Sequence, residues 1–410
     1  MSYELHEYII CHYSCDDYSP LSRIILDSCR YCIHHFPPSF FFPLLKWSCN
    51  KVRNTLWQQK VHEDVDDGNV APSTMSDRFA LQGKWILILQ AVIVELDNDN
   101  DRKSPFYAHI FADECATKYD DGAVTSSAET ELGMSWGHIN DQITPCLLNA
   151  IAHPYDKCRD HIASCLFQMC YYHREFVDNC QASRNDVESA SKSDELGTQV
   201  IERLSSIRDM ETYSFKERVR ALGTARKFVA CCVHWGDAKY AYSDYIVPLL
   251  PLAFLSLQTF DEVVSSEDRG IEADLVKGFR YSIADISSSC VVSYGVSEDM
   301  TRVLDVVKEM SSHECWQIRQ ASAHFLRNFQ GVHKFLFTAE QESMSLSIAI
   351  SLLADDRREV SNAATSTLTG ILAMLPKPAL EELVTKYIAM ANKVRHTSYP
   401  PSILPHRNMY

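Results

Sequence analysis

Two short stretches decide the predicted fold: Ile318-Arg319-Gln320-Ala321-Ser322, which leads to Leu326, and Val360-Ser361-Asn362-Ala363-Ala364, which leads to Leu368. Each starts with an apolar residue, has a small or apolar residue four positions later and a leucine eight positions later. These three positions lie on one face of an α-helix. The two stretches are 42 positions apart, which is within the period of HEAT and armadillo repeats. We therefore predict an all-α, HEAT/armadillo-like helical-repeat solenoid.

A third stretch follows the same pattern further upstream. It runs from Cys158 through Ile162 to Leu166. Polar turns precede the other two copies, Ser311-Ser312-His313-Glu314 and Asp355-Asp356-Arg357-Arg358. A helix pair cannot bury its apolar face alone, so neighbouring pairs stack and share one long core. The alternative is a helical bundle without repeats.

Helical periodicity extends over most of the chain and divides it into five segments. The segments are N-terminal helices at 1–61, whose placement in the repeat is unclear, HEAT-like repeats at 77–178, an acidic flexible loop at 179–197, further HEAT-like repeats at 198–393, and a Pro-containing tail at 394–410. Two further polar gaps fall at 62–77 and 120–138. The predicted helices are 19–35, 41–60, 77–97, 104–118, 139–152, 155–178, 196–209, 214–235, 238–259, 268–293, 297–311, 315–330, 340–354, 357–374 and 377–393.

The composition limits the function classes. The 410 residues are 46% hydrophobic and carry a formal net charge of −15. That charge repels phosphate backbones, so we expect no direct DNA binding. The N-terminus has no secretion signal, and prolines interrupt the apolar stretch 36–47, so we expect no membrane association. The 15 cysteines are expected to be reduced core residues of a nuclear and cytoplasmic protein.

No catalytic motif occurs in the sequence. A nucleophile elbow, a P-loop, a dinucleotide fingerprint and a zinc-protease motif are all missing. We therefore expect a protein that is not an enzyme and needs no cofactor. One metal-like pattern is a candidate: Cys11, Cys15, Cys29 and Cys32 have a spacing that could bind zinc. The alternative is a set of packed or surface thiols.

Two further groups could bind ligands. The first is a basic cluster in the predicted helix 214–235, a candidate polyanion site: Lys216, Arg218, Arg220, Arg226 and Lys227. Its alternative is an ordinary solvated helix face. The second is the aromatic run Phe325, Phe329, Phe335 and Phe337, which could be a ligand cage or part of the core.

From about residue 216 to 373 the sequence resembles the C-terminal part of the large proteasome activator family, that of proteasome activator complex subunit 4. The resemblance lies in Trp316 followed by Arg319, in Phe335-Leu336-Phe337, in the acidic turn at Asp355-Asp356, and in Ser366-Thr367-Leu368-Thr369-Gly370. Upstream, Arg159-Asp160-His161-Ile162-Ala163-Ser164 is similar to another family helix. Residues 1–75 are not covered.

The resemblance implies a non-catalytic segment of a HEAT-like dome that caps the 20S proteasome core particle. Such proteins promote ATP- and ubiquitin-independent proteolysis, including that of acetylated histones in DNA repair. It further implies a bromodomain-like region at about 265–360, with His333 and Phe335 near its acetyl-lysine position. His333 stands where the family has an Asn, whose amide can hold the acetyl carbonyl. Tyr410 is last where the family has Tyr penultimate, so we expect weak or absent gate opening. Inositol phosphates are a further possible ligand.

The alternative function is that of an importin-like or other HEAT-repeat scaffold. An importin-like protein would be favoured by a row of Trp and Asn in successive repeats. The sequence has six Trp, and they form no such row.

Overall fold

The computed structural model describes the following residues: 47–54, 82–83, 85–86, 89, 136–182, 195–209, 212–234, 241–265, 273–293, 297–373, 378, 380–381 and 384–385. Within these ranges the regular structure is entirely helical. The chain divides into two compact units, Met1–Val303 and Leu304–Tyr410, and each is considered by itself.

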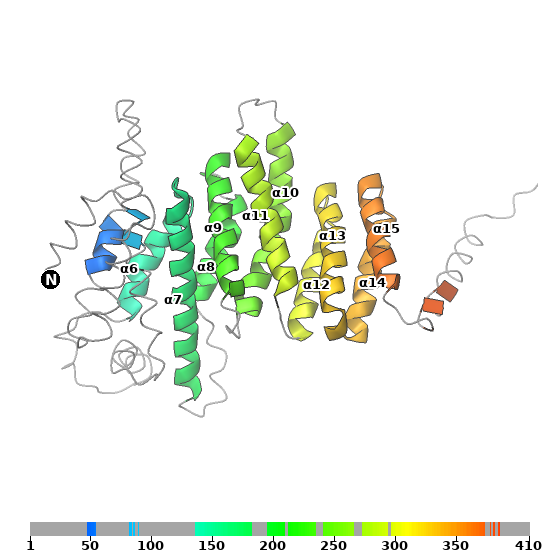
Figure 1. The fold of residues 1–410 in the computed structure, drawn as a ribbon, viewed down its shortest axis with the longest axis horizontal. Helices are drawn as coiled ribbons and strands as arrows, with labels where there is room; N and C mark the ends of the chain where they lie inside the picture. The colour runs from blue at the N-terminus through cyan, green and yellow to red at the C-terminus, as the bar shows by residue number, and fades with distance from the viewer. Residues whose placement is uncertain are drawn as a thin grey trace, which may run out of the picture. The chain divides into compact units, whose positions relative to one another are not determined.

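The first unit contains α6 (Trp136–Asn149), α7 (Asp156–Ala182), α8 (Glu195–Ser205), α9 (Phe215–His234), α10 (Val247–Ser265) and α11 (Ala273–Val292). A 3₁₀ turn, η2 (Ser206–Asp209), follows α8, and a π-helical turn, η3 (Ala241–Ile246), leads into α10. Alternate helices lie side by side: α9 packs against α7 on one side and α11 on the other (Figure 1). On the other layer α10 packs against α8, and it also contacts α11. This two-layer stacking is the packing of a helical repeat.

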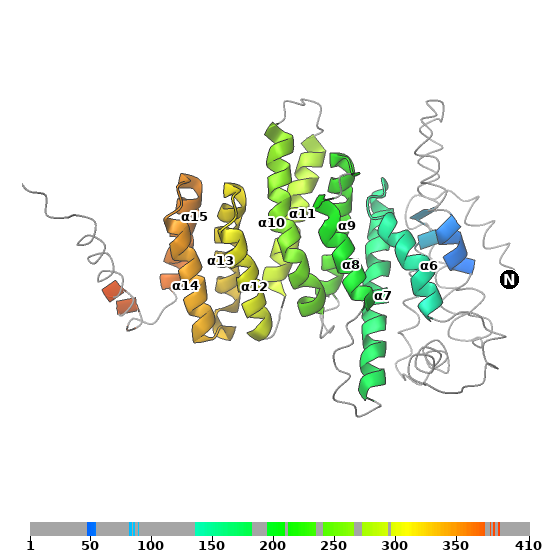
Figure 2. The same cartoon turned by 180° about the vertical axis from the view of Figure 1, so that it is seen from behind.

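The second unit repeats the arrangement on a smaller scale. The helix α12 (Ser297–Ser311) contains the boundary between the units. It is followed by α13 (Trp316–His333), the 3₁₀ turn η4 (Lys334–Leu336), α14 (Ala339–Leu353) and α15 (Arg358–Ala373). Here α13 and α15 lie side by side, and α14 packs against both of them (Figure 2). The predicted helical-repeat fold is therefore confirmed.

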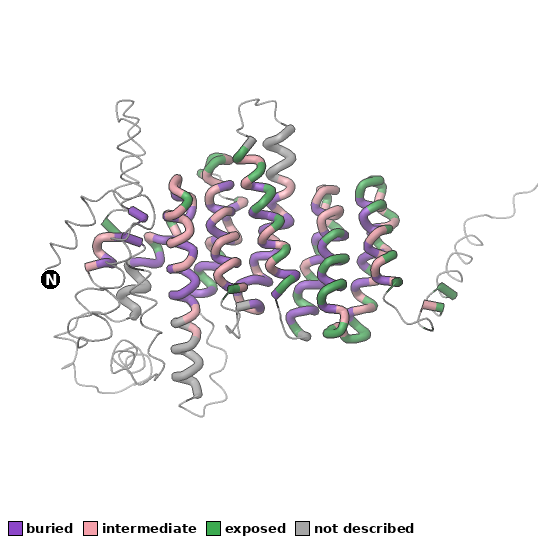
Figure 3. Tube along the Cα trace, viewed as in Figure 1, coloured by how far each residue is buried: buried purple, intermediate pink, exposed green. Residues whose placement is uncertain are grey.

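The repeated sequence pattern marks the buried face of three helices. Its first residues, Cys158, Ile318 and Val360, are fully buried in α7, α13 and α15. So are its fifth residues, Ile162, Ser322 and Ala364. The ninth residues, Leu166 and Leu326, are also buried, whereas Leu368 is half-buried. Buried stripes of this kind alternate with exposed ones along the helices (Figure 3).

The structure shifts several predicted boundaries. Helix α12 has the predicted bounds, but α7 continues to Ala182 and α8 begins at Glu195, so both enter the predicted 179–197 loop. Nothing in 179–182 breaks a helix, since neither Gly nor Pro occurs there. Within the predicted helix 238–259, the described residues Ala241–Ile246 form the π-turn η3. The predicted helices 19–35 and 104–118, the gap 62–77 and the tail 394–410 lie outside the described residues.

Aromatic side chains fill the centre of the first unit. The Phe228 ring of α9 is 6.2 Å from Phe167 of α7 and 5.9 Å from Tyr245 of η3, both in edge-on arrangements. Edge-to-face pairs of this kind add to the free energy gained by burial. They connect neighbouring helices that are far apart in sequence.

Candidate functional site

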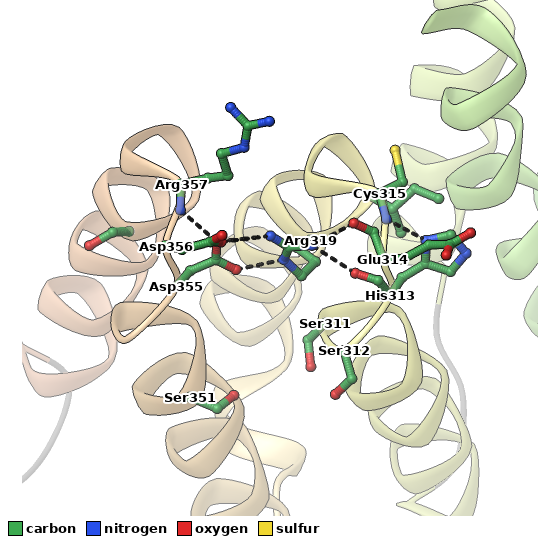
Figure 4. A network of polar contacts seen from close by, with 12 residues as sticks. Ser311, Ser312, His313, Glu314, Cys315, Arg319, Ser351, Asp355, Asp356 and Arg357 are labelled. Atoms are coloured by element: carbon green, nitrogen blue, oxygen red, sulfur yellow. Dashed lines mark hydrogen bonds and ion pairs between the residues drawn. The ribbon is translucent and has the colours of Figure 1, made fainter. Parts of the chain in front are cut away.

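Arg319 lies in the first turn of α13, next to the buried Ile318. Its guanidinium therefore lies beside the turn that enters the helix. Nη1 donates to the backbone carbonyl oxygens of His313, at 2.9 Å, and Glu314, at 2.8 Å. These carbonyls belong to the polar turn between α12 and α13, and Arg319 gives both of them a hydrogen-bond donor (Figure 4).

The same guanidinium also reaches the next polar turn, between α14 and α15. Nε donates to Oδ2 of Asp355 at 2.6 Å, and Nη2 donates to Oδ1 at 2.9 Å. Nη2 is also 3.3 Å from Oδ1 of Asp356. This two-bond geometry is the strong form of an Arg–carboxylate pair. Asp355 also accepts from the backbone N–H of Arg357 at 2.9 Å, so one carboxylate joins the two turns (Figure 4).

The Arg319–Asp355 pair is largely removed from solvent. The side chains are 15% and 7% exposed. Hydrogen bonds from Arg319 lower the pKa of Asp355, and those to Asp355 raise the pKa of Arg319. Both shifts favour the charged forms, so the bridge stabilises the packing of α13 against α15. The role of the pair is therefore structural: it holds the start of α13 against the turn that precedes α15.

Arg159 makes an equivalent set of bonds in the first unit. It lies in the first turn of α7, and its Nη1 donates to the carbonyl oxygens of His153 and Pro154. Nη2 is 2.6 Å from Oδ1 of Asp156 on its own helix. The histidines correspond too: Nδ1 of His153 accepts from the N–H of Tyr155, as Nδ1 of His313 accepts from that of Cys315, both at 3.1 Å.

The repeated sequence pattern aligned Arg159 with Arg319. It did not predict that His153 and His313 also correspond. The signal was present as a repeated His-x₅-Arg spacing, His153 to Arg159 and His313 to Arg319. In the α15 copy Asp355 replaces the histidine, accepting from the N–H two residues later, and Ser361 replaces the arginine. The three turns are therefore variants of one structural unit.

His153 is buried and has a defined tautomer. Because Nδ1 accepts a backbone hydrogen bond, the ring proton is on Nε2, which donates to Oε1 of Gln82 at 2.7 Å. Burial, and secondly the positive charges of Arg159 and Arg220, lower the pKa of His153 to about 4. The ring is therefore neutral near pH 7 and links the α6–α7 turn to residue 82.

The predicted basic cluster does not form one continuous stripe. Lys227 pairs with Asp156, at 3.2 Å, and with Asp160 of α7. Arg226 instead pairs with Asp285 of α11, at 3.1 Å. Arg226 also stacks on the ring of Tyr281, at 5.0 Å. These two cations thus connect α9 to its neighbours on either side.

The other three cationic residues of the cluster lie nearer the start of α9. Lys216 is exposed, and Arg218 and Arg220 are half-buried. Of the five predicted residues of the polyanion site, Lys216 is thus the exposed one.

His333 and Phe335 lie in different environments. His333 is 1% exposed, with its ring 4.8 Å from that of Phe329 in the core of the second unit. Phe335, by contrast, is 94% exposed. Of the aromatic run, Phe325 and Phe337 pack on Phe329, at 5.6 and 5.7 Å. Phe325 and Phe329 are thus part of the core, Phe337 is half-buried against Phe329, and Phe335 projects into solvent.

The candidate zinc ligands Cys11, Cys15, Cys29 and Cys32 lie outside the described residues. In the part that is described, no three His, Cys, Asp or Glu side chains are placed to hold a metal ion. None of the described helices is both long and apolar enough to span a bilayer.

The fold and its turns define a helical-repeat protein. No family model and no curated protein matches the sequence. Among solved structures, the chain is similar to an engineered protein, with 16% identity, a TM-score of 0.24, and 68% of this chain and 96% of that chain covered. It is also similar to Kap121p, with 11% identity, a TM-score of 0.28, and 90% of this chain and 40% of that chain covered. The fold assignment itself rests on the helix packing described above.

Proposed function

We propose that this chain is a non-catalytic protein-binding scaffold and that its partner is the 20S proteasome core, as for a segment of a proteasome activator. The observation that carries this proposal is the resemblance over residues 216–373. Its motifs coincide with structural features of the second unit: Trp316 begins α13, and the acidic turn Asp355-Asp356 receives Arg319. The residues that carry the resemblance thus include those that join the two polar turns of the second unit.

A scaffold role agrees with the chemistry of the described surface. Arg319 and Asp355 use their polar groups to join two turns. Arg226 and Lys227 use theirs to join α9 to α11 and α7. Stacked helix pairs present extended surfaces for protein partners. The same proposal includes two further expectations: the protein is nuclear and cytoplasmic, and it contributes to the degradation of acetylated histones.

The experiment is a direct binding measurement between the purified chain and purified 20S core, by biolayer interferometry. We expect saturable binding, with a Kd in the micromolar range or tighter. A panel of small GTPases, each loaded with GTP or GDP, tests the importin-like alternative. Binding to a GTP-loaded GTPase together with no binding to 20S core would replace the proteasome proposal with that alternative.

Polyanion binding is a second, separable property. Inositol hexakisphosphate is the probe, measured by calorimetry. If the N-terminal part of α9 binds it, Lys216→Ala should weaken the binding severalfold. Arg226→Ala should have a smaller effect, because Arg226 is already paired with Asp285. An equal loss in both variants would place the anion elsewhere on the helix.

A further inference from the structure

We draw no further inference here: the strongest candidate, the exposed apolar patch of Val332, Phe335 and Leu336 at the turn between α13 and α14, has both basic and acidic residues beside it, and nothing in the structure shows what covers it.

Discussion

The guanidinium of Arg319 lies edge-on to the carboxylate of Asp355, with Nε to Oδ2 at 2.6 Å and Nη2 to Oδ1 at 2.9 Å. The two residues are 36 positions apart and belong to different helix pairs. Arg319 also donates to two carbonyl oxygens of its own turn. This single side chain therefore joins one helix pair to the next within the second unit.

Removing one partner of this bridge should be costly. Arg319→Met leaves Asp355, 7% exposed, without its countercharge, and we expect the free energy of unfolding of this unit to fall by about 2–4 kcal/mol. Hydrogen exchange of α13 and α15 peptides in the full chain measures the loss. Adding Asp355→Leu should recover part of it, as the coupling in a double-mutant cycle. Additive losses would show that the bridge contributes nothing.

The stability of the second unit should depend strongly on one of its phenylalanines and hardly at all on another. Phe329 is fully buried and contacts Phe325 and Phe337, so Phe329→Ala should lower the free energy of unfolding by about 3–5 kcal/mol through the cavity it leaves. Phe335→Ala should change it by less than about 0.5 kcal/mol. Urea unfolding followed by circular dichroism checks both variants. A large loss from Phe335→Ala would contradict its exposure.

The capping box of α14 gives a third prediction. The Thr338 hydroxyl accepts from the N–H of Gln341, and the Gln341 side chain accepts from the N–H of Thr338. Thr338→Ala should destabilise the second unit by about 1 kcal/mol. The control is Thr369→Ala, an exposed threonine inside α15 that bonds only to Thr365 of its own helix among the hydrogen bonds described. It should be neutral or slightly stabilising, since alanine favours a helix.

His153 should make the first unit less stable in mild acid. Its pKa in the fold is about 4, below its ordinary value of 6.5. The unfolded chain therefore binds the proton first, and stability present above pH 6.5 is lost as the pH falls from 6.5 towards 4. His161, also with its pKa lowered to about 4 by burial, adds to the same loss.

His153→Gln should remove about half of that pH dependence, measured as the urea midpoint between pH 7 and 5. Glutamine can still bond to Gln82 but does not titrate in this range. His313→Gln, a change at the equivalent turn, is the control and should leave the dependence in place. An unchanged pH dependence in His153→Gln would show that His153 is protonated equally readily in both states.

The amino-acid sequence by itself determined the helices and their buried faces. The spacing of Ile318, Ser322 and Leu326, repeated at Val360, fixed one apolar face per helix, because 3.6 residues per turn places these positions together. The end of α12 followed from the polar turn Ser311-Ser312-His313-Glu314. The predicted end of α7 at residue 178 was four residues short, because residues 179–182 are polar but do not break a helix.

Only the tertiary structure decided which side chains meet. Arg226 and Lys227 are adjacent in the sequence, yet they pair with α11 and α7 in opposite directions, because neighbouring positions on a helix point about 100° apart. His333 and Phe335 are two positions apart, yet one is buried and the other projects into solvent. The carboxylate partners of Arg319 lie 36 and 37 positions away, and no local pattern specifies a contact that arises when two helix pairs stack.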